Sequence, residues 1–140
     1  MNRPYPVETA YLIDDSEVDL FVHRKFIELR QLASEIVTFN SPSVALEKMS
    51  TVPDNGTAGI LFLDLNMPMI NGFEFLEKAK KISTGAFNRM RVVILTSSNS
   101  HTDRERAQTF ENVISFIPKP LTVQGIDDII KLIGVENKSH

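Results

Sequence analysis

The chain has 140 residues, of which 42% are hydrophobic and 24% charged, and this size and composition fit one globular domain. Its 15 basic and 18 acidic residues are interspersed and give a net charge of −3, which argues against direct binding to nucleic acid. The chain has no cysteine and no apolar run near the roughly 20 residues of a membrane span, so we expect a cytoplasmic single domain over residues 1–140, with a core at about 9–133 and no membrane association.

Short apolar runs alternate with segments of helical periodicity from the start of the chain. Residues 11–13 are predicted to form the first strand, and Ser16 then begins a helix with a capping-box-like turn. The apolar stripe expected on this helix is Val18, Phe21, Val22, Phe26 and Leu29. Residues 35–39 are predicted as a second, more polar strand near an edge of the sheet. Ser41 and Pro42 then begin a helix that continues to about Met49.

The same alternation continues through the second half of the chain. A third strand is predicted to end at Asp64, and a loop and a helix at residues 73–82 follow it. Residues 83–91 are predicted to form a loop before a fourth strand. The remaining segments are a helix at 101–110 anchored by Ala107 and Phe110, a strand at 113–118, an amphipathic helix carrying Val123, Ile126, Ile130 and Ile133, and a frayed tail at 134–140.

Five strand–helix units with short links predict an α/β fold, with a doubly wound five-stranded parallel sheet and right-handed crossovers. Such sheets bind ligands beyond the carboxyl ends of their strands, at a topological switch point. Polar residues follow four of the apolar runs at this edge: Asp14, Asp15, Asp64, Thr96 and Lys119. We therefore expect these five side chains to converge in one cleft.

The residue types at this edge predict chemistry with a divalent cation and a phosphoryl group. Three carboxylates in one place repel one another unless a proton or a cation relieves the repulsion, and oxygen ligands of this kind suit Mg²⁺. An ionised aspartate can attack phosphorus to form an acyl phosphate. Lys119 would supply a positive charge for the transferred oxygens, and the Thr96 hydroxyl would supply a hydrogen bond.

These motifs resemble the receiver domain of two-component response regulators, in particular its stand-alone, chemotaxis-type members. The segment 64–72, with the sequence DLNMPMING, is similar to the family's loop around the phosphorylated aspartate. The acidic pair at 14–15, the Thr96-Ser97 pair and the Lys119-Pro120 pair match the family's other motifs in the same order along the chain. The similarity extends from about residue 11 to residue 133, and it implies a flavodoxin-like (βα)5 fold with strand order 2-1-3-4-5.

The resemblance also implies a role for each matching residue. Asp64 would accept a phosphoryl group from the phosphohistidine of a histidine kinase or phosphotransfer protein, with Thr96 and Lys119 binding the phosphoryl oxygens. Mg²⁺ would be held by Asp14 (mainly through water), Asp15, Asp64 and the backbone carbonyl of Asn66. The peptide bond before Pro120 would be cis. No enzymatic turnover of a separate substrate is implied.

A switch would follow phosphorylation, because the added charge attracts the Thr96 hydroxyl and vacates space behind it. Phe116, at a position where many family members have tyrosine, could rotate into that space. The surface formed by helix 101–110, the fifth strand and the last helix would then change shape. With no output domain expected after residue 133, the signal would leave through a downstream protein target at this surface or through a further phosphotransfer.

Two other functions remain open at this point. A receiver-like interaction module without phosphorylation would need none of these site residues, yet all of them are present. An aspartate-nucleophile phosphatase of the haloacid dehalogenase type would carry an acid two residues after the nucleophile, where this chain has Asn66. A P-loop is missing, and Asp14-Asp15 would repel a flavin phosphate. His23, His101 and His140 lack metal-ligand spacing and are predicted to lie on the surface.

Overall fold

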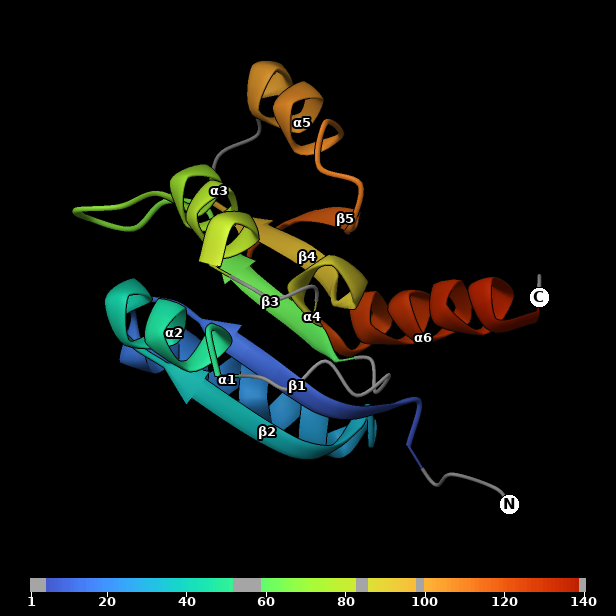
Figure 1. Cartoon of the computed structure of the whole chain (residues 1–140). Coiled ribbons are helices and arrows are strands. Elements are labelled where there is room, and N and C mark those ends of the chain that lie inside the picture. The colour runs from blue at the N-terminus through green and yellow to red at the C-terminus, as the bar shows by residue number, and fades with distance from the viewer. Residues whose placement is uncertain (1–4, 52–58, 83–85, 98–99, 139–140) are drawn as a thin grey trace.

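The computed structural model describes residues 5–51, 59–82, 86–97 and 100–138, and over these it contains one five-stranded sheet (Figure 1). The strand order is β2-β1-β3-β4-β5, and every neighbouring pair is parallel. The strands are β1 (Val7–Ile13), β2 (Ala33–Phe39), β3 (Ile60–Asp64), β4 (Arg91–Thr96) and β5 (Val113–Pro118). The predicted doubly wound sheet and its strand order are therefore confirmed, and β2 is an edge strand as expected.

Helices cover both faces of the sheet (Figure 1). They are α1 (Glu17–Leu29), α2 (Pro42–Met49), α3 (Gly72–Ile82), α4 (Ala86–Arg89), α5 (His101–Ala107) and α6 (Val123–Lys138). Buried residues of α2 and α3 pack on one face, and buried residues of α1 and α6 pack on the other. Among the described residues, no helix combines the length and the apolar character that crossing a membrane requires.

The central strands β3 and β4 carry uninterrupted apolar runs, Ile60–Leu63 and Val92–Leu95, because both of their faces are covered. Successive residues of a strand point to opposite faces, so Leu61 and Leu63 enter the core beneath α2 and α3, whereas Phe62 enters the core beneath α1 and α6. All five residues of β3 are buried. Uninterrupted apolar runs of this kind are what identify buried parallel strands in a sequence.

Several predicted boundaries differ from the structure. β1 begins at Val7, four residues before its predicted start, and α5 ends at Ala107, three residues before its predicted end. The predicted loop 83–91 contains the short helix α4, which Phe87 anchors with 1% of its surface exposed, while residues 83–85 lie outside the described residues. β2 begins at Ala33, two residues before the predicted start. Helix α6 continues to Lys138 and does not fray from Gly134, since a single glycine lowers helix stability without ending a helix.

The apolar stripe predicted for α1 is wrong at three of its five residues, although Phe26 is partly buried and packs against the core as predicted. Val18, Phe21 and Leu29 are 72%, 63% and 67% exposed. The residues that α1 buries are instead Leu20, His23 and Ile27. Two sets of residues in this segment have helical spacing. The buried set contains His23, which is not apolar, and hydrophobic periodicity therefore favoured the exposed set.

The revised orientation of α1 predicts opposite outcomes for two similar truncations. Ile27→Ala removes a side chain with 0% exposure and is expected to lower the free energy of unfolding by about 2–5 kcal/mol. Leu29→Ala, its matched control on the same helix, is expected to change it by no more than about 0.5 kcal/mol. Urea denaturation of both variants measures the difference, and equal losses would contradict the assignment of the buried face.

Candidate functional site

The carboxyl ends of four strands lie at one level of the sheet. Ile13 at the end of β1 is in register with Leu63, one residue before Asp64. Asp64 is in register with Leu95, and Thr96 is in register with Pro118. The residues that follow these strands are thereby brought to a single edge, as the parallel sheet predicted.

Three carboxylates gather at this edge. One oxygen each from Asp14, Asp15 and Asp64 lies within 4.8 Å of the others. Asp14 and Asp64 are 3% exposed, whereas Asp15 is exposed to solvent. A set of oxygen donors, two buried and one open, fits a hard divalent cation that keeps part of its water shell, which is the preference of Mg²⁺.

Lys119 reaches into the same cluster from the end of β5. Its Nζ lies 2.8 Å from Asp14 Oδ2 and 3.4 Å from Asp64 Oδ1. A third carboxylate, Asp19 of α1, accepts a hydrogen bond from this ammonium at 2.8 Å. Although burial acts to lower the pKa of Lys119, the hydrogen bonds to Asp14 and Asp19 raise it well above its ordinary value. The side chain is therefore a fixed positive charge at the site.

The electrostatics of Asp64 differ from those of a surface aspartate. Burial and the nearby charge of Asp14 raise the pKa of Asp64 to about 6, although Lys119 acts in the opposite direction. The Asn66 backbone N–H donates to Asp64 Oδ1 at 3.2 Å and also favours the ionised form. In the protein alone, the positive charge of Lys119 does not fully offset the negative charges around Asp64, so the cluster favours an added cation.

Thr96 lies at the end of β4 and is fully buried. Its hydroxyl donates a 3.0 Å hydrogen bond to Asn66 Oδ1, on the loop after Asp64. Its carbonyl accepts a 2.8 Å hydrogen bond from the Lys119 backbone N–H. Thr96 thus joins the loop that carries Asp64 to the segment that carries Lys119.

Local hydrogen bonds hold the loop after Asp64 close to the sheet. Asn71 and Glu74 cap α3 reciprocally: the Glu74 N–H donates to Asn71 Oδ1 at 2.9 Å, and the Asn71 N–H donates to Glu74 Oε1 at 3.1 Å. The Gly72 N–H donates to the Leu65 carbonyl at 2.9 Å. A Cβ at Gly72 would lie 3.0 Å from Leu65 Cα, so a glycine permits this close approach.

The remaining predicted residues lie on β5 or on the segments directly before and after it. The peptide bond between Lys119 and Pro120 is cis, as predicted. Phe116 is half-buried, and the Arg104 guanidinium of α5 lies over its ring at 4.9 Å from the centroid. Ala107 and Phe110 are buried and anchor α5 and the turn after it, as predicted. The aromatic position therefore connects the edge strand to α5.

Two residues near the site were missed by the sequence prediction. Asp19 was not predicted as a site residue, yet it pairs with Lys119. His23 was predicted on the surface but is 1% exposed, and its Nε2 accepts a 3.2 Å hydrogen bond from the Leu121 backbone N–H. Asp19 and His23 are four residues apart, and this spacing, which places both on one face of α1, was the signal available in the sequence. Their partners, Lys119 and Leu121, lie about a hundred residues later in the chain.

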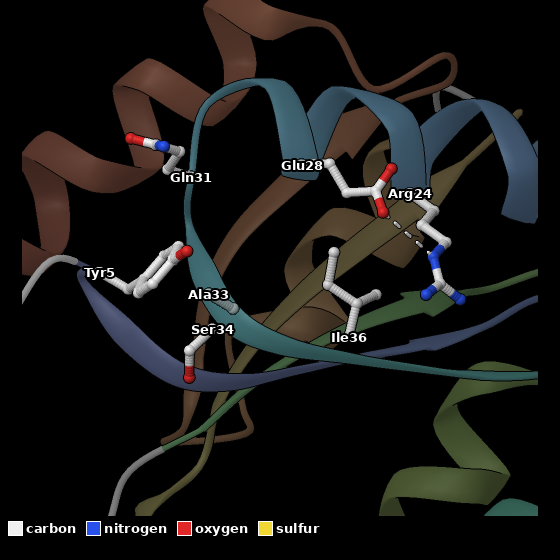
Figure 2. Close-up of a pocket in the computed structure, with 7 residues that line it drawn as sticks. All are labelled: Tyr5, Arg24, Glu28, Gln31, Ala33, Ser34 and Ile36. Carbon is white, nitrogen blue, oxygen red and sulfur yellow. Dashed lines mark ion pairs between the residues drawn. The ribbon is translucent and has the colours of Figure 1, made fainter.

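A separate hollow of about 280 Å³ lies at the opposite edge of the sheet (Figure 2). It lies beside the amino ends of β1 and β2, where Arg24 and Glu28 form a 3.6 Å ion pair on α1. Its lining residues are Tyr5, Arg24, Glu28, Gln31, Ala33, Ser34 and Ile36. None of the predicted site residues lines it, so the candidate site remains the acidic edge.

Comparisons with known proteins agree with this fold. The response regulator receiver domain family model matches residues 10–131. The two-component response regulator ARR15 of Arabidopsis thaliana is 32% identical over 130 residues, which cover 86% of this chain and 60% of the plant protein. A response regulator receiver protein from Dyadobacter fermentans DSM 18053 is 28% identical with a TM-score of 0.80, covering 91% of this chain and 98% of that one. A two component response regulator from Cytophaga hutchinsonii is 26% identical with a TM-score of 0.81, covering 91% and 96%.

The chain therefore belongs to the response regulator receiver domain family, and its role lies in two-component signalling. It spans about 60% of the length of the plant relative.

The contact of His23 predicts a specific pH dependence of stability. Burial lowers the pKa of His23, which Asp19 and Asp14 act to raise and Lys119 acts to lower. As pH falls below about 6.5, the unfolded chain takes up a proton on this imidazole before the folded chain does. The free energy of unfolding is thus expected to fall by up to about 1.4 kcal/mol per pH unit from this group.

His23→Gln keeps a hydrogen-bond acceptor but does not titrate. Its free energy of unfolding is expected to fall less than that of the parent between about pH 7.5 and about pH 5.5. Urea denaturation in the presence of a chelator measures both proteins at both pH values. Parallel pH profiles would show that His23 is not held neutral in the fold.

Proposed function

We propose that this chain is a phosphorylation-dependent switch whose Asp64 accepts a phosphoryl group from a histidine kinase or phosphotransfer protein. The observation that carries the proposal is the Lys119 ammonium 3.4 Å from the buried Asp64 carboxylate, beside Asp14 and Asp15. Family membership supports it, because receiver domains interact with such partners. The exchange would take place in the cytosol, which the cysteine-free composition favours.

In this proposal Asp64 is the nucleophile. A carboxylate oxygen of Asp64 forms a bond to phosphorus while the bond between phosphorus and the donor imidazole breaks, and the imidazole leaves. Lys119 donates hydrogen bonds to the transferred oxygens. Mg²⁺, held by Asp14, Asp15, Asp64 and the Asn66 carbonyl, would supply positive charge to the same oxygens when it is bound.

Thr96 would couple the phosphorylated site to the rest of the domain. Its hydroxyl donates to Asn66 Oδ1, and a phosphoryl oxygen is a stronger acceptor that would draw this hydrogen bond away from the amide. Phe116, on the adjacent edge strand, would respond together with Arg104 of α5. The surface formed by α5, β5 and α6 would thus present a different shape to a downstream protein.

The two alternative functions are less well supported. Asn66 accepts a hydrogen bond from the Thr96 hydroxyl and carries no acidic group. A phosphatase of the haloacid dehalogenase type would need an acid/base residue at this position to hydrolyse small phosphate esters. We therefore propose no enzymatic turnover beyond the domain's own phosphorylation and dephosphorylation. An interaction module without phosphorylation would have no need for a buried carboxylate paired with Lys119.

A phosphoryl donor tests the proposal directly. Incubation with acetyl phosphate and Mg²⁺ is expected to add one phosphoryl group, detected by intact-mass spectrometry and by a mobility shift in phosphate-affinity gels. Asp64→Asn is expected to abolish the addition, because an amide is not a nucleophile for phosphorus. Glu74→Gln, a matched control in the cap of α3, should still accept the group. A parent protein that stays unmodified would leave the interaction module as the better hypothesis.

Magnesium is expected to stabilise the fold through the acidic cluster. Bound ligand raises the free energy of unfolding by about 2.7 kcal/mol when its free concentration is about 100 times its Kd. Asp15→Asn removes one carboxylate donor and is expected to weaken Mg²⁺ binding by about tenfold or more. Glu8→Gln, an exposed acid of β1 outside the cluster, serves as the control. Urea denaturation over a MgCl₂ titration measures both, and equal Mg²⁺ dependence in all three proteins would argue against this site.

A further inference from the structure

Asp19 contributes a carboxylate to the site from outside the strand ends. Ser16 caps α1 by accepting the Asp19 backbone N–H at 3.2 Å, which places Asp19 in the first turn of the helix. Its Oδ2 then lies 2.8 Å from Lys119 Nζ, as close as Asp14 Oδ2 and closer than Asp64 Oδ1 at 3.4 Å. The two shortest contacts of the ammonium are thus with carboxylates other than the proposed phosphoacceptor.

A lysine ammonium has three N–H donors and no acceptor. Asp14, Asp19 and Asp64 already surround these donors. A phosphoryl group on Asp64 adds further oxygens within reach of the same ammonium, so one of the existing contacts must weaken. Asp14 has a side chain that is 4% exposed, whereas the Asp19 side chain is 38% exposed and can exchange Lys119 for water. The contact with Asp19 is therefore the one that opens at the smallest cost.

The backbone around Lys119 is held on both sides. The Lys119 N–H donates to the Thr96 carbonyl at 2.8 Å. The Leu121 N–H donates to His23 Nε2 at 3.2 Å, and His23 lies one helical turn after Asp19 on the same helix. The backbone of this segment is fixed between β4 and α1. Rotation of the Lys119 side chain therefore determines whether its ammonium contacts Asp19 or Asp64.

We propose that Asp19 is a positioning residue that holds the Lys119 ammonium toward α1 and competes with a phosphoryl group on Asp64 for it. This inference rests on the proposed function. It assigns to α1 a direct effect on how strongly the site holds a phosphoryl group. The hydrogen bond from Lys119 lowers the pKa of Asp19, so the pair is charged at neutral pH and the competition operates there.

Beryllofluoride, a non-covalent phosphoryl mimic, provides the test. Its Kd is measured at saturating Mg²⁺ by isothermal titration calorimetry for the parent, Asp19→Asn and Asp19→Glu. Asp19→Asn is expected to bind about two- to fivefold more tightly, a range set by an ion pair with one partly exposed partner. Asp19→Glu keeps the charge and is expected to return the Kd toward the parental value. A purely structural role for Asp19 would weaken binding instead.

Two controls separate the contact from general effects of charge and folding. Glu17→Gln removes the same charge from the same helical turn at a residue that contacts Asn40 and is expected to leave the Kd unchanged. In a Lys119→Met background, Asp19→Asn is expected to have no effect on the Kd, since the competing ammonium is absent. Asp19→Ser repeats the test with a second side chain, and thermal denaturation checks that each variant is folded.

The outcomes distinguish this inference from the function on which it rests. A folded Asp19→Asn protein with an unchanged or higher Kd overturns the inference, as does an equal gain in Glu17→Gln or in the Lys119→Met background. A parent protein that binds no beryllofluoride with Mg²⁺ overturns the proposed function, and the inference with it. Tighter binding by Asp19→Asn that requires Lys119 supports the inference and the proposed function.

Discussion

The concentration of negative charge at one edge of the sheet is the constraint on which the site depends. Asp14, Asp15 and Asp64 lie within 4.8 Å of one another, and two of them are almost fully buried. Carboxylates in such an environment repel one another and lose hydration, so their ionised forms need compensation from nearby positive charge. Lys119 provides part of it, yet burial and the charge of Asp14 still raise the pKa of Asp64. The chemistry proposed for this site, with a bound cation and a transferred phosphoryl group, follows from that imbalance.

The fold meets this constraint by holding the charged side chains on short, hydrogen-bonded connections. The loop after β3 is tied down at Gly72 and by the reciprocal cap between Asn71 and Glu74. The segment after β5 is tied to Thr96 on one side and to His23 on the other. Groups that repel one another can remain close only where the backbone beneath them cannot move apart, and here the apolar strands and these bonds supply that rigidity.

The sequence predicted the parts of this arrangement that depend on local pattern. Buried parallel strands produce continuous apolar runs, and the polar residue after each run marks the edge where the strands end, so the gathering of Asp64, Thr96 and Lys119 at one edge was predicted. The face of α1 could not be found in this way, because Val18 and Phe21 give a cleaner helical period than the true buried face, which contains His23. Asp19 was missed for a different reason. Its partner Lys119 is separated from it by a hundred positions, and only the packing of α1 beside the end of β5 brings the two together.

His23 and Asp64 also illustrate how one site places opposite demands on the stability of the fold. The pKa of Asp64 is raised above its unfolded value, so its burial contributes stability that is present at low pH and is lost as pH rises through about 6. The pKa of His23 is lowered by burial, so its contribution is retained at neutral pH and is lost as pH falls below about 6.5. Near neutral pH the histidine therefore holds the Lys119 segment in place without opposing the fold, whereas the ionised aspartate does oppose it. The ionised aspartate thus acts against the fold at neutral pH, and the cation proposed for the acidic edge would offset part of that effect when bound.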